Sequence, residues 1–122
     1  GLSYTNFAYG DLQLSSQELT GNQYLAASIT VTNTGKLAGE EVVQLYIRDV
    51  VGSITRPMKE LKGFRKIFLQ PGQSQVVKFM ISPDDLKFYD NNGHLDWEPG
   101  AFQIFIGSNS RDLKMKEISW VK

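Results

Sequence analysis

The side chains that could perform chemistry are few and widely spaced along the sequence. His94 is the only histidine, and it lies in a predicted turn beside Gly93, where a solvated imidazole is expected. A Ser-His-Asp triad would need this histidine, and no Gly-x-Ser-x-Gly motif is present to expose a serine. The chain has no cysteine, which excludes a thiol nucleophile, a disulfide and a thiolate metal site. We therefore predict no metal site and no cofactor.

Pairs of carboxylates are the remaining route to catalysis, because common glycosidases place two carboxyl groups about 5 to 10 Å apart across a sugar cleft. The candidate pairs are Glu40-Glu41, Asp84-Asp85 and Asp96-x-Glu98. Neighbouring residues on a strand point to opposite faces, and helix capping explains Asp84-Asp85. We predict that the chain has no catalytic residue and is not an enzyme on its own.

Two other groups of side chains suggest binding. Trp97 and Tyr89 lie in one connection with Phe88 and His94, and exposed aromatic rings can stack on sugars. The alternative, which we favour, is that these rings cap the open end of the fold. The second group lies in the connection 49–57, where apolar residues outside any clear strand either fold back on the core or dock against another domain.

Alternating apolar and polar residues define the elements that must position these side chains. Four strands are clear, at 25–31, 41–49, 75–81 and 101–107. Three weaker strands, at 6–14, 58–69 and 113–121, have patchy alternation typical of a sheet edge or of a bulge at Gly10 or Gly63. One short helical turn is predicted near 83–88, with Ser82 as its cap and Pro83 in its first position. This pattern predicts an all-β, seven-stranded antiparallel sandwich of two sheets.

The composition fits one soluble domain spanning residues 1–122. Its 122 residues are 41% hydrophobic and 21% charged, and 13 basic residues balance 13 acidic ones. The balance of charge argues against nucleic acid and anionic membranes as partners, and no apolar stretch is long enough to cross a membrane. Residues 1–4 lack a signal pattern and a methionine, so we expect a piece of a longer protein. The compartment stays open, with periplasm or secretion favoured over cytoplasm.

Five separated motifs resemble one known module over essentially the whole chain. In order, they are GLSYTxFxY at 1–9, VTNTGK at 31–36, EVVQLYIRD at 41–49, TRPxKELKGF at 55–64, and EPG at 98–100 followed by Ile106-Gly107. This combination is similar to the fibronectin type III-like domain at the C-terminus of family 3 glycoside hydrolases, the β-glucosidase and β-xylosidase group. The resemblance implies a sandwich of the fibronectin type III or immunoglobulin kind.

The resemblance also implies a role and partners. The catalytic residues of that family lie on upstream domains, so none of them maps onto this chain. The implied role is a non-catalytic accessory domain that packs against the upstream catalytic domains of a β-glucosidase or β-xylosidase, with residues 1–5 as the lead from them. A homodimer of that parent enzyme is left open. The docking residues that we predict are Leu2, Tyr4, Val51, Ile54, Arg56 and Pro57.

Two other functions stay open from the sequence. The first is a carbohydrate-binding module that uses an aromatic patch around Trp97 and Tyr89. The second is an adhesion or chaperone sandwich that exists by itself, against which the missing initial methionine argues.

Overall fold

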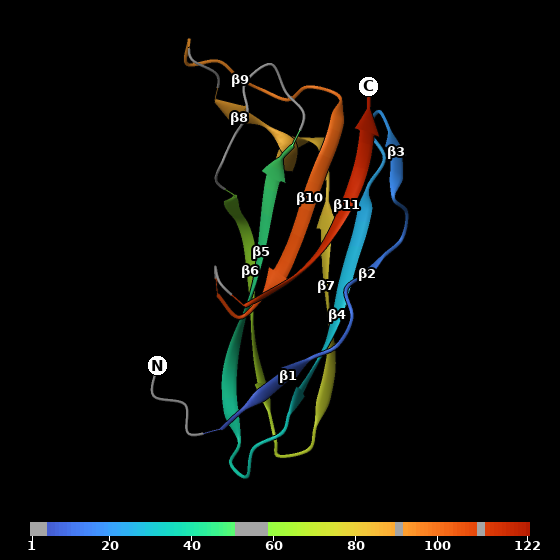
Figure 1. The fold of residues 1–122 in the computed structure, drawn as a ribbon. Helices are drawn as coiled ribbons and strands as arrows, with labels where there is room; N and C mark the ends of the chain where they lie inside the picture. Colours follow the sequence, from blue (N-terminus) through green and yellow to red (C-terminus); the bar gives the residue numbers. More distant parts are fainter. Residues whose placement is uncertain (1–4, 51–58, 90–91, 110–111) are drawn as a thin grey trace.

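Apolar side chains at every second position turn most of the chain into strands, which form two β-sheets packed face to face (Figure 1). The computed structural model describes residues 5–50, 59–89, 92–109 and 112–122. Within these residues, the elements are β1 (Phe7–Tyr9), β2 (Gln13–Leu14), β3 (Glu18–Thr20), β4 (Leu25–Asn33), β5 (Gly39–Asp49), β6 (Glu60–Leu69), β7 (Ser74–Ile81), the 3₁₀ helix η1 (Pro83–Leu86), β8 (Phe88–Tyr89), β9 (Leu95–Asp96), β10 (Gly100–Gly107) and β11 (Leu113–Val121).

The first sheet is built around β4, which pairs with β1 and β2 along one edge and with β7 along the other. The second sheet has the strand order β3-β11-β10-β5-β6. The connections from β4 to β5 and from β6 to β7 cross between the sheets at one end of the sandwich, which we call the β4–β5 end (Figure 1). Helix η1 and the β8–β9 pair lie at the opposite end, which we call the cap end (Figure 1).

The predicted sandwich is confirmed, and all seven predicted strands are present. The four clear strands match β4, β5, β7 and β10, while the predicted strands 58–69 and 113–121 match β6 and β11. The predicted bulge at Gly63 is also found, because the register between β5 and β6 shifts where Leu45 pairs with Gly63 but Tyr46 pairs with Leu61. As predicted for an edge strand, β6 ends the second sheet, but the edge position also predicted for 113–121 is wrong, because β11 lies between β3 and β10.

Three details differ from the prediction. The first strand is divided into β1 and β2, and an additional strand, β3, runs parallel to β11 rather than antiparallel. The chain leaves the first sheet after β2 and joins the second, so that Leu19 is buried at the sheet edge beside Trp120. The helical turn is a 3₁₀ helix that ends at Leu86, because the backbone turns extended at Lys87 and forms β8.

The core lies between the sheets and is made by the inward positions of the long strands. Leu25, Ala27, Ile29 and Val31 on β4 face Val43, Leu45 and Ile47 on β5 across the sandwich, and all are buried. Burial of side chains of this size is worth roughly 1.5–3 kcal/mol each relative to exposure. Two tryptophans belong to the same core at the cap end, Trp97 directly after β9 and Trp120 in contact with it.

Candidate functional site

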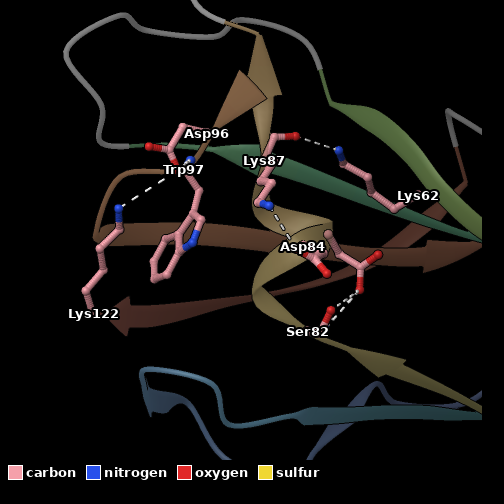
Figure 2. A network of polar contacts seen from close by, with 8 residues as sticks. Lys62, Ser82, Asp84, Lys87, Asp96, Trp97 and Lys122 are labelled. Atoms are coloured by element: carbon pink, nitrogen blue, oxygen red, sulfur yellow. Dashed lines mark hydrogen bonds and ion pairs between the residues drawn. The ribbon is translucent and has the colours of Figure 1, made fainter. Parts of the chain in front are cut away.

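The predicted sugar-binding aromatics lie at the cap end, but they occupy different environments. Tyr89 on β8 is 64% exposed, whereas Trp97 is only 9% exposed. The Trp97 ring packs 6.4 Å from Phe102 and meets the Trp120 ring edge-on at the same centroid distance. Lys122 covers the ring further, with its Nζ 5.2 Å from the ring centroid (Figure 2). The Trp97 ring therefore caps the core at this end while the Tyr89 ring is exposed, and sugar binding by these two residues stays a prediction.

Helix η1 holds the cap end together through its first turn. Ser82 occupies the predicted N-cap position, and its backbone N–H donates to Asp85 Oδ2 at 2.9 Å, which is the bond that the third residue of the turn supplies in a capping box (Figure 2). Leu86 and Phe88, which follow, are buried and fix the turn to the core. At the far side, Lys62 Nζ donates to the Lys87 carbonyl at 3.0 Å (Figure 2). The same Nζ lies 4.5 Å from the Phe88 ring centroid. Lys62 thereby closes the side of the sandwich between β6 and β8.

The carboxylate pairs considered for catalysis make structural contacts. Asp84 pairs with Lys87 at 2.9 Å, and this hydrogen bond raises the pKa of Lys87 (Figure 2). Asp96 Oδ1 accepts the Trp97 backbone N–H at 2.8 Å and lies 3.9 Å from Lys122 Nζ (Figure 2). Among the residues that the structure describes, no three histidine, cysteine or acidic side chains come together in a way that could hold a metal ion.

Glu40 and Glu41 point to opposite faces of β5, as expected for neighbours on a strand. Glu40 pairs with Lys66 at 3.0 Å on the outer surface. Glu41 Oε2 accepts the Tyr9 hydroxyl at 3.1 Å, which links β1 of the first sheet to β5 of the second. Burial raises the pKa of Glu41, and burial, followed by the charge of Glu41, raises the pKa of Tyr9. The pair is a partly buried contact between the two sheets.

A buried polar hub at the β4–β5 end was missed by the sequence analysis, which included Asn33 only as part of the VTNTGK motif. Its Oδ1 accepts Thr5 Oγ1 at 2.7 Å and the Gly35 N–H at 2.9 Å. Its Nδ2 donates to the carbonyls of Leu37 at 2.9 Å and Leu69 at 3.0 Å. The alternation along β4 could have revealed it, because every second residue from Leu25 to Val31 points into the core and Asn33 is the next in that order. The hub ties Thr5, two residues before β1, to both crossings between the sheets.

The six predicted docking residues, Leu2, Tyr4, Val51, Ile54, Arg56 and Pro57, lie outside the described residues. The described ends of the 51–58 segment are Val50 and Lys59, so this segment joins β5 to β6. The Val50 N–H donates to the Ala101 carbonyl at 3.1 Å, which extends the β5–β10 pairing by one residue. In the part of the chain that is described, no helix is long and apolar enough to span a membrane.

The two sheets with their crossings define an immunoglobulin-like β-sandwich, and comparison with known proteins identifies its family. The family model for the fibronectin type III-like domain matches residues 41–110. The chain therefore belongs to the fibronectin type III-like domain family. The matched region begins within β5 and ends just after β10, and it includes η1, β8 and β9.

The similar proteins are much longer than this chain. It is 45% identical over 119 residues to thermostable beta-glucosidase B of Acetivibrio thermocellus, which covers 96% of this chain and 16% of that protein. It is 47% identical over 114 residues to a putative beta-xylosidase of Formosa agariphila, covering 93% of this chain and 15% of the relative. The solved structure of a beta-glucosidase from Erythrobacter marinus superimposes with a TM-score of 0.91 at 45% identity, covering 99% of this chain and 16% of that one. The chain thus spans about 16% of the length of such relatives.

Proposed function

We propose that this chain is the non-catalytic accessory domain of a β-glucosidase-type family 3 glycoside hydrolase. One observation carries the proposal: almost the whole chain, 96% of it, corresponds to 16% of a β-glucosidase at 45% identity. Because almost the whole chain matches one small part of a much longer glycosidase, we take the rest of that polypeptide as the partner of this domain. The proposed role is to pack against the catalytic domains and stabilise them.

The contacts of the carboxylates support a structural role. Asp84, Asp85 and Asp96 hold the cap end together, and Glu41 joins the two sheets. A glycosidase acid and its partner carboxylate must instead face a shared cleft that receives the sugar. The chemistry of the proposed parent enzyme therefore belongs to its other domains.

Deletion of the domain from the parent enzyme tests the proposal. We expect the shortened enzyme to unfold at a lower temperature than the complete one, or to be insoluble, because deletion exposes the surface of the catalytic domains that the deleted domain covered. Separately produced 122-residue chain, added during refolding, should restore part of the lost stability. The measurements are calorimetric melting and turnover of a chromogenic aryl β-glucoside. An unchanged melting temperature together with unchanged turnover would rule the proposal out.

A second candidate function, sugar binding, is favoured only by Tyr89, which is exposed at the cap end next to its cross-strand partner Leu95, itself 50% exposed. NMR titration of the 122-residue chain with cello- and xylo-oligosaccharides tests it. The matched control for Tyr89→Ala is Tyr24→Ala, because Tyr24 is also 64% exposed. Sugar binding predicts shifts around β8 that disappear only in Tyr89→Ala. Unperturbed spectra at millimolar sugar would contradict this candidate.

A further inference from the structure

The two sheets present different side chains on the faces that point away from the core. On the first sheet, β7 carries two exposed apolar side chains, Val76 at 62% and Met80 at 55%. Each stands beside a small residue of β4, because Val76 pairs with Thr30 and Met80 pairs with Ala26. The remaining outward positions of β4 hold Ser28 and Thr32. Apolar side chains on this face are therefore isolated.

On the second sheet, outward apolar side chains form a continuous row across four strands. Leu61 on β6 pairs with Tyr46 on β5, Tyr46 pairs with Phe105 on β10, and Phe105 pairs with Met115 on β11. Directly paired side chains in a sheet are neighbours on one face. The ends of the row are well exposed, Leu61 at 52% and Met115 at 47%.

The apolar surface continues along the edge strand β6 towards the β4–β5 end. Phe64 is 61% exposed and Phe68 is 56% exposed, and both point outward. Lys66 lies between them and pairs with Val42, which is 37% exposed. Together with the row across the sheet, these residues form a surface that we call the outer β6 face: Val42, Tyr46, Leu61, Phe64, Phe68, Phe105 and Met115.

Charged groups lie over and between the apolar side chains of this face, whose unbroken part is the row across the four strands. Lys59 Nζ lies 6.0 Å from the Tyr46 ring centroid and 5.5 Å from that of Phe105. Lys66 forms its ion pair with Glu40 at 3.0 Å between Phe64 and Phe68. Contiguous exposed apolar surface on one side of a domain marks an interaction site, and polar groups at its rim are usual.

The hydrogen-bond hub indicates which partner this face receives. Thr5 is tied through Asn33 to the Leu69 carbonyl, and Leu69 directly follows Phe68. A polypeptide that arrives at Thr5 is therefore delivered to the end of the outer β6 face that holds Phe68. We infer that the outer β6 face is the surface on which the preceding domain of the same polypeptide packs. This inference rests on the proposed function, which supplies that domain.

Two methionines of similar exposure on opposite faces give a direct test. Met115 on the outer β6 face is 47% exposed, and Met80 on the first sheet is 55% exposed. In the 122-residue chain, dilute peroxide should oxidise both at similar rates, because oxidation follows exposure. In the complete enzyme, we expect Met115 oxidation to slow by about tenfold or more while Met80 keeps its rate. Peptide mass spectrometry reads both rates in one sample.

Equal rates for both methionines in the complete enzyme, or protection of Met80 instead, would overturn the inference. So would protection of Met115 in the 122-residue chain itself together with dimerisation in sedimentation equilibrium, because the face would then bind a second copy.

A pair of charge substitutions gives an independent check: Phe64→Glu with Phe68→Glu should lower the melting temperature of the complete enzyme, and Val76→Glu with Met80→Glu should not. If deletion of the domain destabilises the enzyme but neither test responds, the proposed function stands and this surface is wrong.

Discussion

The Asn33 side chain uses its whole hydrogen-bonding capacity inside the fold, with two bonds accepted by Oδ1 and two donated by Nδ2. The residue is fully buried, so no water can replace a lost partner. Through these bonds, one side chain fixes the segment before β1, the β4–β5 crossing and the end of β6. The turn sequence at 33–35 is thus a structural centre of the β4–β5 end.

Replacement of this amide by an acid tests the hub. Asn33→Asp places a carboxylate oxygen against the carbonyls of Leu37 and Leu69, and we expect a loss of about 3 kcal/mol in the free energy of unfolding. Part of this loss should return at low pH, where the new carboxyl can donate. Urea unfolding followed by tryptophan fluorescence measures both. Asn6→Asp, at an exposed position, is the control and should change stability by less than about 0.5 kcal/mol.

The close approach of Gly35 to Thr5 gives a second test at this scale. A Cβ added at Gly35 would lie 1.8 Å from Thr5 Oγ1 and 2.8 Å from the Asn6 nitrogen, so Thr5 must move and lose its bond to Asn33. We expect Gly35→Ala to cost about 1–3 kcal/mol. Gly10→Ala is the matched control, because the nearest atom to its added Cβ is 3.6 Å away. Equal unfolding midpoints for the two variants would contradict this account.

At the scale of elements, the cap end shows how short segments complete a sandwich. Helix η1 and the β8–β9 pair contain few residues, yet they contribute Leu86 and Phe88 to the core and lead directly to Trp97. Lysines at the open sides lay their chains over aromatic rings, as Lys62 does on Phe88 and Lys122 does on Trp97. The cap end therefore excludes water from the core where the long strands end.

Alanine substitution of Trp97 and of Tyr89 shows which of these two rings stabilises the fold by packing. We expect Trp97→Ala to lower the free energy of unfolding by about 3–5 kcal/mol, because it leaves a cavity against Phe102 and Trp120. Tyr89→Ala should cost less than about 1 kcal/mol, because that ring is mostly exposed. Thermal unfolding by circular dichroism compares the two variants. A small effect of Trp97→Ala would show that this ring is not part of the core.

At the scale of the whole molecule, stability depends on contacts between the two sheets, and one of them is sensitive to pH. Tyr9 and Glu41 join β1 to β5, and burial raises the pKa of Glu41. A carboxyl group with a raised pKa binds its proton more readily in the folded state than in the unfolded chain. Its contribution to stability is therefore greatest below its unfolded pKa, about 4.3, and declines as the pH rises through its folded-state pKa.

Glu41→Gln removes this titration while keeping an acceptor for the Tyr9 hydroxyl. We expect the variant to gain stability relative to the unmodified chain as the pH rises from about 4 to about 7, because only the unmodified chain then buries a charge. Glu40→Gln serves as the control for removal of a charge from the same strand. Urea unfolding at several pH values gives the comparison. A stability difference that does not vary with pH would contradict the effect of Glu41.

The sequence by itself determined which side of each long strand faces the core. Side chains alternate across a strand with a period of two, so the apolar positions of 25–31, 41–49, 75–81 and 101–107 had to point the same way whatever the strands paired with. The local chemistry of capping likewise placed Ser82 and Pro83 at the start of η1. Both signals act over a few residues, which is why they can be read without the fold.

Only the tertiary structure decided what lies beside what. Trp97 stands in a connection without periodicity, and its burial depends on Trp120, a residue distant in sequence. Asn33 becomes a hub because two crossings and Thr5 meet there. The outer β6 face exists because strand pairing brings residues from β5, β6, β10 and β11 onto one surface. Contacts between residues far apart in sequence are set by the packing of the sheets, and local patterns do not specify them.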